Sequence, residues 1–175
     1  MGKEDDKTKI LLDADVIRNF ISGEKLDLLA KIFSERFCII DRVKNELCRS
    51  KKLKENVMDF IKTENIQEIG FPDSDMDIVF EYGRLIRDGL GDGESACLAF
   101  ARYRKTYISS SNLKDVLNYC KTNGIKNIPT MEVLREALAK NILTENEIDM
   151  FIGKCISKGE RLPAKNWGEY IILDK

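Results

Sequence analysis

Histidine is absent from the 175-residue chain, and this absence excludes more chemistry than any other feature of the composition. Without histidine there can be no Ser-His-Asp or Cys-His catalytic site, no zinc site with imidazole ligands, and no histidine general base. Any chemistry must therefore use carboxylates, lysine, serine, tyrosine, cysteine or a metal ion.

Paired cysteines are also missing. The five cysteines are widely spaced, none forms a Cys-x-x-Cys pair, and their number is odd. A disulfide framework or a zinc site is therefore not expected. Cys38 and Cys97 stand in apolar runs, which predicts that both lie in the core.

Long hydrophobic runs are absent as well. No apolar stretch approaches 18 residues, and the first six residues are mostly charged. We therefore expect no membrane span, no signal peptide, no membrane partner and a cytoplasmic location. Lys plus Arg is 29 and Asp plus Glu is 30, so the net charge of −1 does not by itself support nucleic-acid binding.

The apolar pattern predicts an α/β fold. Short apolar runs alternate with segments of helical spacing, and runs 8–13 and 37–40 are continuous, as in strands buried on both faces. We expect a three-layer α/β/α sandwich with a central, mostly parallel sheet of four to five strands. The expected strands are 8–13, 37–40, 66–71, 106–109 and 125–128. The helix 94–104 is apolar almost all round and should be buried.

The same pattern predicts the domain limits. Residues 1–7 are expected to form a flexible tail and 8–160 the single domain. Residues 161–175 should form an irregular tail that docks through Trp167, Tyr170 and Ile171.

Four acids stand where strands end or helices begin: Asp13, Glu46, Glu94 and Asp115. In a parallel sheet these places meet at the carboxyl edge, where ligands collect. Carboxylates gathered there would repel each other unless a divalent cation joined them, and oxygen ligands suit Mg²⁺ or Mn²⁺. The pattern therefore predicts a metal-dependent phosphoester or phosphodiester site.

The first two acids, Asp13 and Glu46, each have an alternative explanation. Either Asp13 or Asp15 could cap the helix that follows the first strand, and we expect Asp15 to be the cap. Glu46 could equally be a solvent-facing residue of its helix.

The other two acids have similar alternatives. Glu94 could merely favour the helix dipole, with Asp92 as the cap, or Asp92 could be the ligand and Glu94 the dipole partner. Asn112 and Asp115 could form a capping box.

Basic residues gather in two segments, 42–54 and 102–105. Either segment could follow a phosphate backbone, although a solvated helix face is the commoner explanation. The predicted RNA-binding residues are Arg42, Lys44, Lys51, Lys52, Lys54, Arg102 and Arg104.

The order of these motifs resembles the PIN-domain family, which includes toxin ribonucleases of VapC type. The resemblance rests on LDADVI at 12–17, VKNEL at 43–47, GESACLA at 93–99 and SSNLKD at 110–115. It implies a parallel α/β/α sandwich and endonucleolytic cleavage of RNA that depends on Mg²⁺ or Mn²⁺. An antitoxin protein and a second copy of the chain are the further partners that it implies.

The resemblance also implies roles for individual residues. Asp13, Glu46, Glu94 and Asp115 match the family's catalytic acids, and the first, third and fourth of these would hold metal. Asp15, Asp92, Ser110 and Asn112 would be auxiliary. Family members often have Asp where this chain has Asn112, so the fourth ligand is either Asn112 or Asp115.

Two other functions are compatible with parts of the sequence. Asp13-Ala14-Asp15-Val16 and Gly91-Asp92-Gly93 also suit a haloacid-dehalogenase-type phosphatase, but the second motif should then follow a strand, whereas residues 82–88 predict a helix. The other is a non-catalytic PIN-like module that binds nucleic acid or a protein partner.

Overall fold

A four-stranded sheet forms the centre of the molecule, and all of its strand pairings are parallel. The computed structural model describes residues 7–33, 35–112 and 114–173. The strands β1 (Ile10–Leu12), β2 (Phe37–Ile40), β3 (Gln67–Ile69) and β4 (Tyr107–Ser109) lie in the order β3-β2-β1-β4. The predicted parallel α/β sheet is confirmed.

The central strand β1 is wholly buried, as its continuous apolar sequence predicts. Leu11 pairs with Cys38 of β2 on one side and with Ile108 of β4 on the other. The backbone N–H of Asp13 then donates to the carbonyl of Ser109 at 2.9 Å. The chain therefore leaves β1 directly beside the end of β4, and this brings the segments that follow the two strands together.

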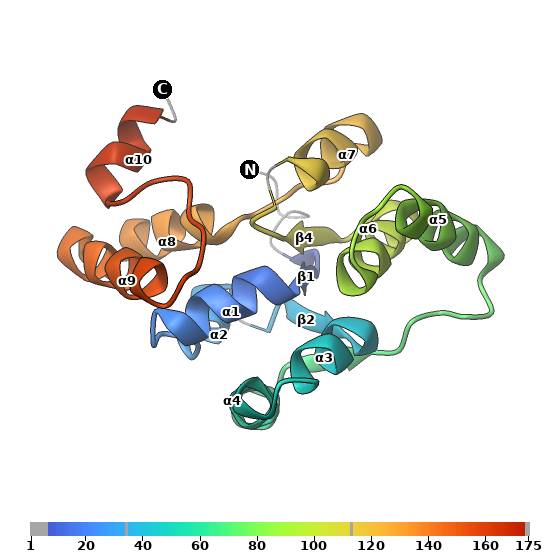
Figure 1. The fold of residues 1–175 in the computed structure, drawn as a ribbon, viewed down its shortest axis with the longest axis horizontal. Coiled ribbons are helices and arrows are strands. Elements are labelled where there is room, and N and C mark those ends of the chain that lie inside the picture. The colour runs from blue at the N-terminus through green and yellow to red at the C-terminus, as the bar shows by residue number, and fades with distance from the viewer. Residues whose placement is uncertain (1–6, 34, 113, 174–175) are drawn as a thin grey trace.

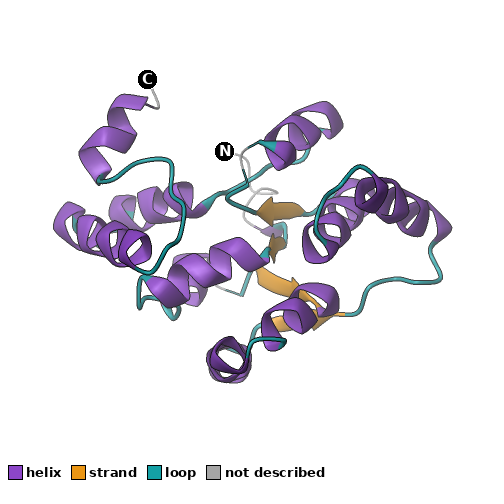
Figure 2. Ribbon diagram, in the orientation of Figure 1, coloured by secondary structure: helices purple, strands orange, loops and turns teal. Residues whose placement is uncertain are grey.

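Helices cover both faces of the sheet, which confirms the three-layer arrangement. Figure 1 shows α5 and α6 on one side of the sheet and α1, α2, α8 and α9 on the other, and Figure 2 shows the strands enclosed between them. The helices are α1 (Ala14–Ser22), α2 (Leu28–Phe33), α3 (Asp41–Cys48), α4 (Lys51–Thr63), α5 (Met76–Arg87), α6 (Asp92–Arg104), α7 (Asp115–Asn123), α8 (Thr130–Ala139), α9 (Glu145–Ser157) and α10 (Trp167–Leu173).

The helix α6 is buried against the sheet, as expected. Its residues 95–99 are all inaccessible to solvent, including Cys97. A Cβ atom on Gly93, in the first turn of α6, would lie 2.9 Å from Val43 Cγ2 and 3.0 Å from Glu46 Oε2. Glycine at this position therefore allows the start of α6 to approach α3 closely.

Two expected features differ from the structure. Residues 125–128 contribute only one bridge, between Ile108 and Asn127, and not a strand. The expected irregular C-terminal tail contains the helix α10. Its predicted docking side chains Trp167 and Tyr170 are buried, and Ile171 is partly buried against the core.

Some expectations concern the chain ends and the membrane. Residues 1–6 of the predicted N-terminal tail lie outside the described residues. Within the described ranges, no helix combines the length and the apolar character that crossing a membrane requires.

Candidate active site

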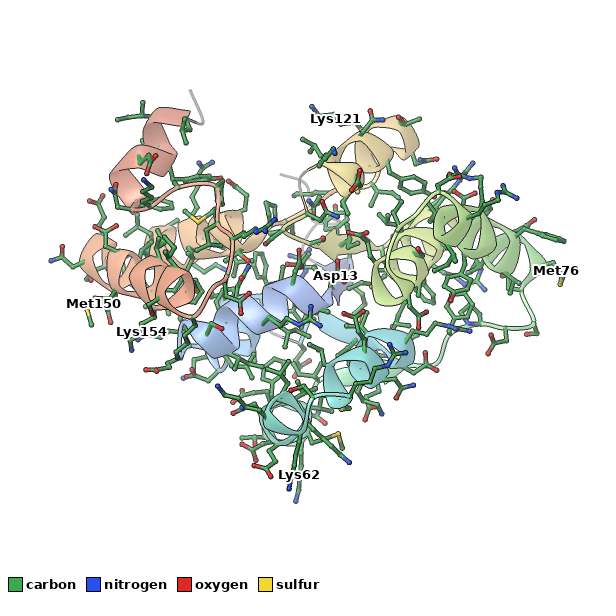
Figure 3. All side chains as sticks on the ribbon, viewed as in Figure 1. Asp13, Lys62, Met76, Lys121, Met150 and Lys154 are labelled. Atoms are coloured by element: carbon green, nitrogen blue, oxygen red, sulfur yellow. The ribbon has the colours of Figure 1, made fainter. Side chains whose placement is uncertain are left out.

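Asp13 lies at the point where β1 passes into α1, and it is labelled there in Figure 3. Its side chain is buried, with 4% of the residue exposed, and accepts a hydrogen bond from the backbone N–H of Ala14 at 2.7 Å. Asp13 is therefore the N-cap of α1, and the expectation that Asp15 would be the cap was wrong. A residue can cap a helix and still present its second oxygen to a ligand.

Asp15 faces the segment that follows β4. Its Oδ2 accepts from the backbone N–H of Ser111 at 2.8 Å and from the Ser110 hydroxyl at 3.5 Å, whereas its Oδ1 is buried without a hydrogen-bond partner. A buried carboxylate oxygen is normally satisfied. The unpartnered oxygen therefore indicates a place for a cation, a water molecule or a proton.

Asn127 fixes the segment that holds Asp15. Its side-chain amide donates to the carbonyl of Ser110 at 3.0 Å, and its side-chain oxygen accepts from the N–H of Ser110 at 3.1 Å. The Ser111 and Thr130 hydroxyls lie 2.7 Å apart and extend the network. Sequence analysis did not identify Asn127, because its pairing with Ser110 depends on the tertiary fold.

Glu94 reaches the same place from the first turn of α6. Its Oε1 accepts from the side-chain amide of Asn112 at 2.8 Å. Burial, and then the nearby charge of Asp13, raise the pKa of Glu94 to about 7. Asn112 thus orients Glu94. The Asn112–Asp115 capping box does not form, because the N-cap of α7 is Lys114 and it makes no side-chain cap hydrogen bond.

Asp13, Asp15 and Glu94 form what we call the acidic cluster. Burial is the largest cause of the raised pKa of Asp13, with a further contribution from the charge of Glu46. Burial and the charge of Asp13 raise the pKa of Asp15, and Glu94 adds to this effect. Like charges that share a desolvated place make each carboxylate harder to ionise. The cluster therefore contains more negative charge than its surroundings balance.

Glu46 lies at the edge of the acidic cluster and is paired with Arg18. The guanidinium of Arg18 donates to Glu46 Oε1 at 2.9 Å, and its positive charge lowers the pKa of Asp13. Sequence analysis did not single out Arg18. Its position one helical turn after Asp15 was the available signal.

The two remaining acids lie differently from the acidic cluster. Asp92 accepts from the Tyr82 hydroxyl at 2.8 Å and lies 3.6 Å from the Arg42 guanidinium. These partners account for Asp92 without any role in the cluster. Asp115 is the first residue of α7; it is exposed and acts on Glu94 only through its charge.

The predicted RNA-binding residues fall into two groups, and the residues of the first group already make ion pairs within the protein. Arg42 pairs with Asp73 and lies over the rings of Phe71 and Tyr82, and Lys44 pairs with Glu68. Arg102 pairs with Glu81 and Arg104 with Asp75.

Lys51, Lys52 and Lys54 make up the second group. All three are exposed in the first turns of α4, and none makes an ion pair with another described residue. Their charges are therefore available to a ligand.

The acidic cluster suits a divalent cation as an open site. Across residues 7–33, 35–112 and 114–173, no three acids or cysteines are arranged so that they could hold a metal ion as a group. Mg²⁺ does not need such a cage, because it keeps several water molecules and binds proteins through one or two carboxylates. The hard oxygen donors and the unpartnered Asp15 Oδ1 fit this mode of binding.

The chain is similar to solved structures and to one family model. A chain of a toxin–antitoxin complex from Klebsiella pneumoniae matches with 16% identity and a TM-score of 0.47, covering 61% of this chain and 89% of that chain. A chain of VapBC2 from Rickettsia felis, bound to a DNA fragment from the promoter, matches with 18% identity and a TM-score of 0.47, covering 69% and 97%. The search of curated proteins found no match. The family model described as PIN domain matches residues 9–173, and the chain therefore belongs to the PIN-domain family.

Proposed function

We propose that this PIN domain is a ribonuclease that hydrolyses RNA phosphodiester bonds with the help of Mg²⁺ or Mn²⁺. The observation that carries the proposal is the acidic cluster: three carboxylates share a desolvated place, and one buried oxygen, Asp15 Oδ1, has no partner. Charge that the fold leaves unbalanced is typical of functional sites. A divalent cation bound there would bring positive charge to the phosphodiester and favour the ionised form of water.

The acidic residues and their neighbours have different roles in this proposal. One or two of the carboxylates of Asp13, Asp15 and Glu94 would bind the cation directly and the others through its water molecules. Ser110 orients the carboxylate of Asp15, and Asn112 orients that of Glu94. Asp115, which is exposed, would act through a water molecule of the cation on the open side. Glu46, held by Arg18, remains a proposed catalytic residue that orients water or substrate at the edge of the site.

Lys51, Lys52 and Lys54 would bind the RNA backbone, because their charges are exposed and lack ion-pair partners among the described residues. Arg42, Lys44, Arg102 and Arg104 would have to leave existing ion pairs to do so. We therefore propose the three lysines as the main backbone contact.

Cleavage of a mixed set of single-stranded and looped RNAs tests the proposal. Wild type should cleave in Mg²⁺ or Mn²⁺ and not in a chelator, and Asp13→Asn should abolish cleavage by removing one charge from the acidic cluster. Asp27→Asn is the matched control: it makes the same chemical change in an exposed Asp27–Lys31 pair and should leave cleavage unchanged. Equal cleavage by Asp13→Asn and wild type would contradict the assignment of the site.

The same experiment separates the other candidate functions. RNA binding without cleavage in either metal would indicate the non-catalytic binding module. Hydrolysis of para-nitrophenyl phosphate would indicate a phosphatase, although α5 and not a strand precedes the 91–93 segment that this function needs. An antitoxin partner, a homodimer and a cytoplasmic location stay predictions; co-purification with the product of a neighbouring gene would test the first.

A further inference from the structure

A cavity lies directly beside the acidic cluster. It has a volume of about 430 Å³ and is lined by residues of α7, the start of α8, the loop that contains Pro163, and α10. Ser111 belongs to both places: it lines the cavity, and its backbone N–H donates to Asp15 Oδ2 at 2.8 Å. A molecule that fills the cavity would therefore contact Ser111, the residue that donates to Asp15 of the acidic cluster.

The lining of the cavity is mostly apolar. Leu117, Pro129, Pro163 and Leu173 supply rigid or apolar surface, and the buried ring of Tyr170 lies among them. Leu117 and Leu173 are 37% and 64% exposed. These two side chains would lose contact with water when the cavity is filled, which favours an apolar occupant.

The polar groups of the lining are already engaged. Glu132 Oε1 accepts from the Tyr170 hydroxyl at 2.6 Å, and Asn127 is paired with the backbone of Ser110. The Thr130 hydroxyl interacts with Ser111 and also accepts from Asn19 at 2.9 Å. Glu132, the charged residue of the lining, is paired with Arg135 at 3.2 Å. No lysine or arginine is among the described residues that line the cavity, so a phosphate group would have no cationic partner there.

We infer that this cavity receives a nucleobase of the RNA strand, next to the phosphodiester at the acidic cluster. This inference rests on the proposed function. A base is flat and apolar on its faces, and single-stranded RNA is commonly held by unstacked bases packed on aromatic and apolar side chains. The cavity volume is within the range of about 300–1,000 Å³ that small-ligand pockets have. Leu117, Tyr170 and Leu173 would then position the strand and influence which bond lies at the carboxylates.

Two neighbouring residues of α10 provide a matched test. Leu173 lines the cavity and Ile172 does not, yet both are exposed, at 64% and 73%. Leu173→Asp and Ile172→Asp therefore add the same charge one residue apart. Leu173→Ala is a third variant that adds no charge.

The measurement is binding of short labelled single-stranded RNAs by fluorescence anisotropy in a chelator, with each base in turn replaced by an abasic site. In wild type and Ile172→Asp, one abasic position should weaken binding about tenfold, which corresponds to one lost stacking contact. In both Leu173 variants the intact RNA should bind correspondingly more weakly, and the abasic position should have little further effect.

Each other outcome would overturn the inference. If wild type cleaves RNA but the abasic scan is flat, or if the Leu173 and Ile172 variants bind alike, the cavity does not hold a base although the proposed function stands. If Leu173→Asp changes only the oligomeric state in sedimentation, the cavity is a protein contact. If wild type neither binds nor cleaves RNA, the proposed function and this inference are both wrong.

Discussion

Two acidic sites in this molecule, Glu81 and the acidic cluster, have opposite electrostatic surroundings. Glu81 of α5, with 7% of the residue exposed, accepts from Arg84 at 2.7 Å and from the Tyr119 hydroxyl at 2.6 Å, and lies 2.9 Å from Arg102. Burial tends to raise its pKa, but the hydrogen bonds from Arg84 and Tyr119 and the two arginine charges together lower it to about 2. Glu81 is therefore a fully compensated anion that joins α5, α6 and α7.

The acidic cluster has the reverse balance. Asp13 is buried, Asp15 and Glu94 are partly buried, and the positive charge of Arg18 is shared with Glu46. The same chain thus compensates one buried acid with two arginines and leaves three others repelling each other. The comparison teaches that the excess charge of the cluster is not a general property of this fold, which supports a functional origin.

Removing the compensated acid should have the largest effect on stability. Glu81→Gln leaves the guanidinium groups of Arg84 and Arg102 without their anion, and we expect the free energy of unfolding to fall by about 3 kcal/mol. This is the lower end of the usual range for a broken buried pair, because both arginines keep access to water. Urea denaturation measures the change.

Glu68→Gln is the control for that experiment, because it removes the carboxylate of an exposed pair with Lys44. Its effect should stay within about 1 kcal/mol. Equal effects of the two substitutions would show that Glu81 is not a buried ionic centre.

Neutralising an acid of the acidic cluster should raise the free energy of unfolding, whereas neutralising Glu81 should lower it. The folded state holds Asp15 and Glu94 with raised pKa values, so between roughly pH 4 and 7 it binds more protons than the unfolded chain. The stability of the metal-free protein should therefore fall as the pH rises through this window. Asp15→Asn should raise the free energy of unfolding at pH 7.5 by roughly 1–3 kcal/mol and flatten the pH dependence.

The absence of histidine makes this measurement direct, because no imidazole titrates in the same window. Thermal unfolding in a chelator from pH 5 to 8 would follow it. A wild-type stability that rises steadily over this range would contradict the raised pKa values of the cluster.

A divalent cation should reduce the contrast between the two sites. Because Mg²⁺ or Mn²⁺ would bind only the folded acidic cluster, a tenfold excess over Kd should stabilise wild type by about 1.4 kcal/mol, or roughly 3–6 °C in Tm. Asp13→Asn should lose this shift and Glu81→Gln should keep it. A thermal shift that is the same in wild type and Asp13→Asn would place the cation elsewhere.

The smallest effect on stability is expected at α4. Replacing Lys51, Lys52 and Lys54 together with alanine should change the free energy of unfolding by no more than about 0.5 kcal/mol, because the three side chains are exposed. RNA binding should weaken, and the slope of log K against log salt should become shallower by about 2. The metal-induced thermal shift should not change; an unaltered salt slope would remove the lysines from the RNA contact.

The features that follow from local patterns were the ones that sequence analysis could predict. The strand at 37–40 and the buried helix after Gly93 each follow from a continuous apolar pattern, and the structure contains both. Asp13 could be chosen as a site candidate because it stands at the end of a strand of a parallel sheet. Glu94 could be chosen because it is an acid in the first turn of a buried helix.

The missed features depend on tertiary partners. Whether Asp13 or Asp15 caps α1 depends on where Ser111 lies, and the spacing of the sequence cannot give that position. Asn127 and Arg18 act through Ser110 and Glu46, which are distant in the sequence. Residues 125–128 pair with the sheet through one bridge, from Asn127 to Ile108, and so do not form the predicted strand. The apolar pattern of the sequence cannot give the number of bridges.

The order of the strands also has a consequence during protein synthesis. The neighbour of β1 on one side is β4, which the ribosome makes much later, and Asn127, which fixes the segment after β4, is made later still. A chain whose synthesis stops after α6 contains Asp13, Asp15 and Glu94 but not the serines that hold Asp15. Truncated translation products should therefore lack an assembled acidic cluster, and the proposed site would be complete only once the chain through Asn127 has left the ribosome.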